Sequence, residues 1–183
     1  MKKILIFVTT LDGKITKWGN PDIRSWSSGD DQDYFDAILS NARIIIMGAG
    51  TYEPDPVIPV KNHLYVVMTR HPEKFKAREV PGHLEFSNED PKKLINRLEK
   101  EGQERLLVVG GPQIATLFLK EQLIDELWLT LEPKIFGTGG NFVIEEKFDI
   151  SLILINSERI NDKGTLINKY RVIKKIKIEQ AIT

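Results

Sequence analysis

Four carboxylates lie close together in one short stretch of the sequence: Asp30, Asp31, Asp33 and Asp36. A carboxyl group in a partly apolar pocket has a raised pKa, so it can supply a proton near neutral pH. A structural explanation is also open, because Ser27, Ser28 or Asp30 can cap a helix and acidic residues in a first turn complement the helix dipole. The sequence therefore indicates either an acid catalyst or the start of a helix.

Glycines follow two apolar runs that have the length of buried strands. Gly110 and Gly111 end the run "LLVV" just before a helical pattern that begins with Pro112, and Gly48 and Gly50 follow "RIIIM". In an open α/β sheet, ligands bind beyond the carboxyl ends of the strands, where glycine permits close backbone approach and a helix N-terminus attracts anions. These positions predict phosphate-binding turns, with a plain strand-to-helix connection as the alternative.

A third apolar run, "LYVVM", ends in Thr69 and Arg70. A hydroxyl and a guanidinium side by side suit a phosphate monoester, because arginine makes charge-assisted and often bidentate contacts with phosphate oxygens. Together with the two glycine-bearing strand ends, this pair predicts a site for an adenosine nucleotide that carries an extra phosphate, with a solvated arginine at a strand end as the alternative.

Seven apolar runs predict strands at residues 4–10, 43–47, 64–69, 106–109, 126–133, 151–157 and 165–174. Helical patterns lie between them at residues 30–41, 91–101 and 112–121. Continuous apolar runs suit strands buried on both faces, so we expect an α/β fold: a three-layer, mixed and mostly parallel sheet with helices on both faces. Turn signals without a helix after Asp125 predict antiparallel strands at the C-terminal edge. We expect one domain over residues 1–175 and a tail over residues 176–183.

The composition narrows the class of partner. Lys plus Arg and Asp plus Glu number 26 each, so no net field favours nucleic acid or a membrane surface, and a small molecule is the expected partner. The chain has no cysteine, and its three histidines lack ligand spacing, so we expect no metal site. No run of about 20 apolar residues and no signal segment is evident. We expect a cytoplasmic protein.

The sequence resembles the dihydrofolate reductase fold, and more closely the reductase domain of riboflavin biosynthesis. The residues that carry the likeness are "TTLDGKI", "WSSGDDQDYF", "IIIMGAGTYE", "VVMTR" and "VVGGPQIATLFLKEQLIDELWLTLEPKIFGTG". The resemblance implies an eight-stranded sheet, with an eighth strand near residues 83–86, and NADPH as cofactor. Gly110 and Gly111 would then meet the pyrophosphate, with Gln113 and Ile114 in the same turn. The remaining cofactor contacts would be Gly48 and Thr51 on the ribose-phosphate side, and Thr69 and Arg70 on the 2′-phosphate.

The same resemblance implies a substrate site. Aligning "DDQDYF" with the first helix of dihydrofolate reductase implies that Asp31 is the substrate-binding acid, with Asp33 as the second candidate. "LDGKI" resembles the loop over the nicotinamide and substrate, so Asp12 and Lys14 would line the pocket. Arg24, Trp26 and Ser27 precede the helix and are further substrate-binding candidates. The aromatic ring of Trp26 would cover a planar substrate or pack in a small apolar cluster.

We therefore expect an NADPH-dependent reductase that acts by hydride transfer on a ribosylaminopyrimidine phosphate or a related pyrimidine or pterin compound. A dihydrofolate or pterin reductase, and a nucleotide-binding domain without catalysis, are the alternatives. Relatives of this fold often pair through their C-terminal strands, so the resemblance also implies a homodimer through residues 152–155 or 166–172.

Overall fold

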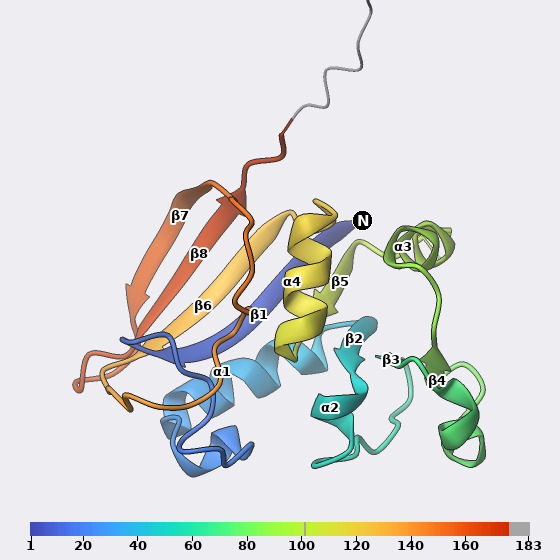
Figure 1. The fold of residues 1–183 in the computed structure, drawn as a ribbon, viewed down its shortest axis with the longest axis horizontal. Coiled ribbons are helices and arrows are strands. Elements are labelled where there is room, and N and C mark those ends of the chain that lie inside the picture. The colour runs from blue at the N-terminus through green and yellow to red at the C-terminus, as the bar shows by residue number, and fades with distance from the viewer. Residues whose placement is uncertain (101, 176–183) are drawn as a thin grey trace, which may run out of the picture.

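The computed structural model describes residues 1–100 and 102–175, and this part of the chain forms one eight-stranded sheet (Figure 1). The strands are β1 (Lys2–Thr10), β2 (Ile44–Gly48), β3 (Leu64–Met68), β4 (Leu84–Ser87), β5 (Arg105–Val108), β6 (Glu126–Glu132), β7 (Leu152–Arg159) and β8 (Leu166–Val172). Their order is β4-β3-β2-β5-β1-β6-β8-β7. The first six strands in this order run parallel, whereas β8 pairs antiparallel with β6 and β7 antiparallel with β8. The expected mixed, mostly parallel sheet is confirmed, including the eighth strand, β4.

The predicted helices are present, with ends within two residues of those expected where the structure describes them. They are α1 (Gly29–Ser40), α3 (Pro91–Glu99) and α4 (Pro112–Lys120). Residue 101, the predicted end of α3, lies outside the described residues. Three short helices were not predicted from the sequence: α2 (Ala49–Tyr52) and the 3₁₀ helices η1 (Ile23–Ser25) and η2 (Pro72–Arg78). Helices of one or two turns bury too few residues to leave a periodic pattern.

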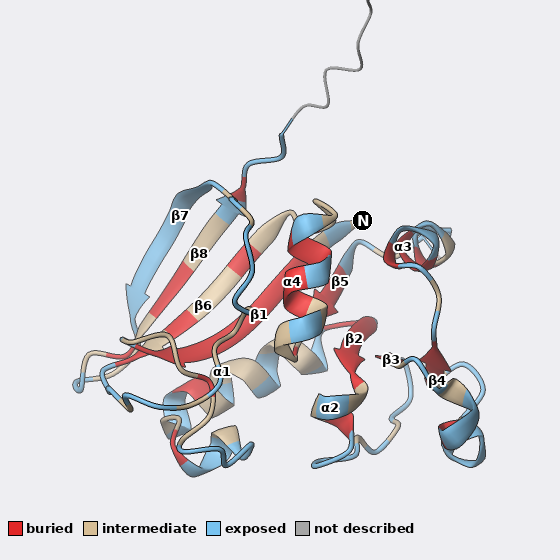
Figure 2. Cartoon of the chain, in the orientation of Figure 1, coloured by how far each residue is buried: buried red, intermediate tan, exposed pale blue. Residues whose placement is uncertain are grey.

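The central strands are buried on both faces because helices cover both sides of the sheet. On one side, Leu94 of α3 and Phe118 of α4 pack in a core that includes Leu5 and Val108. On the other side, α1 contributes Ile38 to a core with Phe75 of η2 and Phe86 of β4. Figure 2 shows β1, β2 and β5 as largely buried ribbons in the middle of the molecule. These two cores explain why the central strands are continuous apolar runs rather than alternating ones.

The C-terminal edge of the sheet has the opposite character. All eight residues of β7 are exposed, among them the four consecutive apolar residues at positions 152–155, and the strand appears pale blue along its length in Figure 2. A register shift between Leu154 and Asn156 interrupts its pairing with β8. The expected tail, residues 176–183, lies outside the described residues. No helix in the described part of the chain is long and apolar enough to cross a membrane.

Candidate active site

Asp31 is the buried acid at the carboxyl end of the parallel strands. It lies in the first turn of α1 with 5% of its surface exposed. Thr130 of β6 and Ser27 both form side-chain hydrogen bonds with its carboxyl group. Burial raises the pKa of Asp31, the bond with Thr130 opposes that rise, and the charge of Glu132 adds to it. Asp31 is therefore a group that can hold a proton at a higher pH than an ordinary aspartate.

The N-cap of α1 and the buried acid are two different residues, so capping of the helix does not account for the buried carboxyl group. Ser28 is the N-cap, and its hydroxyl oxygen accepts a hydrogen bond from the backbone N–H of Asp31 at 3.3 Å. The Asp31 side chain is turned toward the sheet, whereas Asp33 is exposed on the outer side of α1. Of the two acids proposed from the sequence, Asp31 has the environment of a proton donor. The catalytic role of both stays a prediction.

Glu132 is a second buried carboxyl group at the carboxyl end of the parallel strands, and it was not among the site residues predicted from the sequence. It is the last residue of β6 and is 2% exposed. Its Oε1 accepts a hydrogen bond from the backbone N–H of Ser28 at 2.7 Å, and its Oε2 accepts one from the Thr165 hydroxyl at 3.0 Å. The only available signal was a glutamate within the apolar run "LWLTLEP", where an acid is unexpected.

The three substrate-binding candidates in the segment before α1, namely Arg24, Trp26 and Ser27, have different surroundings. Trp26 is 4% exposed, and its ring packs edge-on against that of Phe136 with centroids 5.2 Å apart. Arg24 lies on η1, is exposed, and pairs with Asp36 of α1 at 2.9 Å. Ser27 contacts Asp31 directly. The structure thus brings Ser27 and Asp31 together, places Trp26 in an apolar contact, and engages Arg24 in a surface ion pair. Substrate binding by these residues stays a prediction.

Hydrogen bonds connect the loop after β1 to the loop after β6. The Asp12 carboxylate accepts a hydrogen bond from the Thr10 hydroxyl at 2.5 Å and from the backbone N–H groups of Phe136 at 3.2 Å and Gly137 at 2.8 Å. These donors lower the pKa of Asp12, the Thr10 hydroxyl most of all. Lys14 donates to the side chain of Asn141 at 2.8 Å. Both side chains hold the two loops together, and their contact with substrate stays a prediction.

The two glycine-bearing strand ends lie against each other. The backbone N–H of Gly48 donates to the carbonyl of Gly110 at 3.1 Å. A Cβ atom on Gly110 or Gly111 would lie 3.2 or 3.1 Å from the Thr51 hydroxyl oxygen, and one on Gly48 would lie 3.0 Å from Ile114. Gly110 also has φ of 145°, which L-residues rarely adopt. Close packing of two strand ends is therefore one sufficient reason for these glycines.

The same turns retain groups that fit a dinucleotide phosphate. Gly111 is the N-cap of α4 and has no side chain to cap the helix, and the N–H groups of Gln113 and Ile114 have no acceptor among the described residues. Arg70 is exposed at the end of β3, and its guanidinium forms no ion pair within the described part of the chain. The Thr69 hydroxyl accepts a hydrogen bond from the His71 N–H at 3.2 Å. Free helix N–H groups and an unpaired arginine suit an anionic ligand, so these residues fit NADPH.

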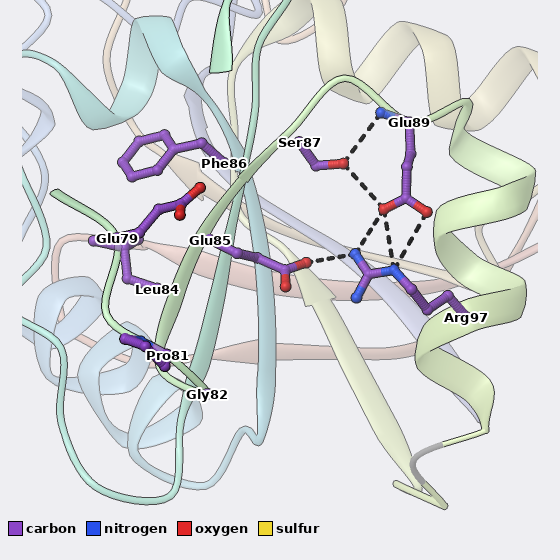
Figure 3. A pocket seen from close by; sticks show the side chains of 9 residues that line it. All are labelled: Glu79, Pro81, Gly82, Leu84, Glu85, Phe86, Ser87, Glu89 and Arg97. Carbon is purple, nitrogen blue, oxygen red and sulfur yellow. Dashed lines mark hydrogen bonds and ion pairs between the residues drawn. The ribbon is translucent and has the colours of Figure 1, made fainter. Parts of the chain in front are cut away.

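A hollow beside β4 is already occupied by an internal ion-pair network (Figure 3). Arg97 of α3 reaches Glu85 at 2.5 Å and Glu89 at 2.7 Å, and Ser87 also donates to Glu89. The Arg97 hydrogen bonds lower the pKa of Glu89. Because the guanidinium is neutralised by two carboxylates, this hollow offers no free cation to a phosphate.

The strand order and the positions of the buried acid and the glycine turns define a dihydrofolate reductase-like fold. Residues 2–166 match the model of the RibD C-terminal domain, so the chain belongs to that family.

The chain is also similar to individual proteins. The uncharacterized protein YwjB of Bacillus subtilis (strain 168) is 28% identical over 169 residues, which cover 90% of each chain. The structure matches a protein assigned to riboflavin biosynthesis in Shewanella sp. PV-4, with a TM-score of 0.74, 23% identity and coverage of 95% of this chain and 100% of that one.

A third similarity is to the diaminohydroxyphosphoribosylaminopyrimidine deaminase/5-amino-6-(5-phosphoribosylamino)uracil reductase of Thermotoga maritima. Its TM-score is 0.71 at 19% identity, with coverage of 93% of this chain and 56% of that one. At these identities the two solved structures show a shared fold.

Proposed function

We propose that this protein is an NADPH-dependent reductase of a ribosylaminopyrimidine phosphate or a related pyrimidine or pterin compound. The observation that carries the proposal is the buried Asp31 carboxyl, which is hydrogen-bonded to Thr130 and Ser27 at the edge of the sheet where α4 begins. Family membership supports it, as does the name of the Thermotoga maritima protein, which includes a uracil reductase activity.

NADPH supplies a hydride when it is bound, and the residues of this chain have the remaining tasks. The N–H groups at the start of α4 hold the pyrophosphate, and Arg70 with Thr69 holds the 2′-phosphate. Asp31 delivers the proton that a reduction by hydride transfer also consumes, while Thr130 and Ser27 orient its carboxyl group. Burial raises the pKa of Asp31, which is the direction that a proton donor near neutrality requires.

The decisive experiment is a fluorescence titration of the nucleotide-free protein with NADPH and, in parallel, with NADH. We expect micromolar binding of NADPH. In Arg70→Ala, NADPH should bind more weakly by about 1.5–3 kcal/mol, because a charge-assisted contact with the 2′-phosphate is lost, while NADH binding stays the same. Arg43→Ala is the matched control. Arg43 is also exposed, but it lies just before β2, at the amino ends of the parallel strands, whereas Arg70 follows the carboxyl end of β3.

Each outcome of this titration has a defined meaning. Absence of binding by both nucleotides would contradict the proposal. Binding without NADPH oxidation across pyrimidine and pterin substrates would favour a nucleotide-binding domain without catalysis. Oxidation with dihydropterins but not with ribosylaminopyrimidine phosphates would identify the pterin alternative.

We also propose that the protein is a homodimer that pairs through β7. The four exposed apolar residues 152–155 lie on an edge strand with an unpaired side, and an exposed apolar edge of this kind can pair with another chain. A cytoplasmic location, expected from the sequence, stays part of the proposal.

A further inference from the structure

Glu132 has the surroundings of a residue that holds another in place. It is almost completely buried, and no ion pair to a described residue neutralises its carboxylate. Its two oxygens instead accept hydrogen bonds from the Ser28 backbone and the Thr165 hydroxyl. A buried carboxylate without a cation is costly, so a packing role alone would be served better by an apolar side chain.

The two donors belong to elements that are distant in the sequence. Ser28 caps α1, and Thr165 ends the turn between β7 and β8. The same turn makes a second connection, since Asn161 donates from Nδ2 to Asp30 at 3.0 Å and to the Thr165 hydroxyl oxygen at 2.9 Å. The first turn of α1 is therefore tied both to the end of β6 and to the β7–β8 turn.

We infer that Glu132 is a positioning residue for Asp31, anchoring the N-cap of α1 so that the Asp31 carboxyl meets Thr130. Thr130 and Glu132 are two residues apart on β6, so their side chains lie on the same face of the sheet. Thr130 forms a hydrogen bond with the Asp31 carboxyl group itself, whereas Glu132 accepts a hydrogen bond from the N-cap of the helix that contains Asp31. The consequence of this positioning for catalysis rests on the proposed function, whereas the arrangement itself does not.

The arrangement also places two carboxyl groups in one buried region. The charge of Glu132 is one of the causes that raise the pKa of Asp31, after burial itself. Other titratable groups surround the pair: Asp30 and Tyr34 on α1, Glu158 on β7, Lys169 on β8 and Lys134 after β6. Burial raises the pKa of Tyr34 to about 12, so its phenol is neutral near pH 7.

The two nearby lysines have other partners. Lys169 lies over the rings of Trp128 and Tyr34, and Lys134 donates to the Trp26 carbonyl.

The test is a pH titration of the Asp31 carboxyl by ¹³C NMR in Glu132→Gln, without nucleotide or substrate. Glutamine keeps the shape and an acceptor for the Ser28 N–H but removes the charge. We expect the midpoint of Asp31 to fall, because a like charge nearby has been removed. Glu126→Gln, at the other end of β6, is the matched control and should leave the midpoint unchanged. An unchanged midpoint in Glu132→Gln would overturn the inference, because an anchor that holds the Asp31 carboxyl beside Thr130 also brings it within reach of the Glu132 charge.

A second measurement keeps the inference testable if Glu132→Gln does not fold. The Ser28 amide of the unaltered protein should exchange slowly with solvent, and exchange should accelerate in Thr165→Val, which removes the other hydrogen bond to Glu132. Exchange of Ser28 at the rate of an open loop amide in the unaltered protein would contradict the anchor.

Neither measurement needs NADPH, so failure of the nucleotide to bind would overturn the proposed function and leave this inference to its own test. In an active enzyme, a merely structural role for Glu132 would leave the pH profile in place. Glu132→Gln should instead move the high-pH loss of kcat to lower pH, because Asp31 must be protonated to donate.

Discussion

Thr130 and Asp31 are joined by a side-chain hydrogen bond that connects β6 to the first turn of α1. The two residues are 99 positions apart in the sequence. They meet because β6 pairs parallel with β1, with Val8 opposite Thr130 and Thr10 opposite Glu132, and α1 follows β1 across one face of the sheet. The burial of Asp31 therefore depends on the order of the strands in the sheet.

Asp31→Asn should lower the rate of NADPH oxidation by about 10²- to 10⁴-fold, because the proton donor is lost while the shape is kept. Nucleotide affinity should change little, since Asp31 is not among the residues proposed to hold the phosphates. Steady-state kinetics with a responding substrate, and an NADPH titration, measure the two effects. Asp33→Asn is the matched control, because Asp33 is exposed on the same helix. Equal loss of rate in both variants would contradict the role of Asp31.

The same variant should change how stability depends on pH. The folded-state pKa of Asp31 is raised above its ordinary value of 3.8, so the wild type loses stability from this group as pH rises from about 3.8 through the folded-state pKa. Asp31→Asn cannot ionise and avoids that loss. The free energy of unfolding of the variant minus that of the wild type should therefore be larger at pH 7 than at pH 4, as measured by denaturant unfolding. The reverse trend would show that Asp31 is stabilised as the anion.

Thr51 limits the side chains that Gly110 and Gly111 can carry. Gly111→Ala should destabilise the fold by about 1–3 kcal/mol, because the new Cβ would lie 3.1 Å from the Thr51 hydroxyl oxygen. In a Thr51→Ala background much of that cost should disappear, giving a coupling above about 0.5 kcal/mol. Gly110→Ala should stay costly in both backgrounds, because its φ of 145° is unfavourable for alanine. Denaturant unfolding of all combinations tests this, and additive effects at Gly111 would contradict it.

Asp12 should control the order of the loop after β6. Asp12→Ala removes the acceptor for the N–H groups of Phe136 and Gly137, so both amides should exchange faster with solvent. The folded-state pKa of Asp12 is lowered from 3.8, so its contribution is present above about pH 3.8 and is lost as pH falls through the lower value. Asp22→Ala, in the same loop region, is the control. Protection of Gly137 that survives Asp12→Ala would show that other contacts order the loop.

The exposed β7 edge gives a prediction about assembly. The protein should sediment as a dimer of 20.9 kDa chains at micromolar concentration, and Leu154→Lys should dissociate it, because a charge would be buried at the interface. Leu117→Lys, on an exposed leucine of α4, should leave the dimer intact. A single 20.9 kDa species in the unaltered protein would contradict pairing through β7.

The local pattern of the sequence was sufficient for the elements with strong periodicity. Apolar runs such as "ILIFV" and "IIIM" predicted buried strands, and Pro91 and Pro112 marked the first residues of α3 and α4. Strand β4 left a weak signal because Glu85 interrupts its four residues, so its prediction depended on the family resemblance. The one-turn helix α2 left none.

The contacts of the site depended on the tertiary structure. The sequence places Asp31 among four similar acids, and only the packing of α1 against β6 buries it and leaves Asp33 exposed. Glu132 could not be identified, because its hydrogen-bond donors, the Ser28 N–H and the Thr165 hydroxyl, come from segments 104 and 33 residues away. Local pattern determines which residues are apolar or can cap a helix. The pKa of an acid depends on which distant groups surround it, and that is decided when the sheet assembles.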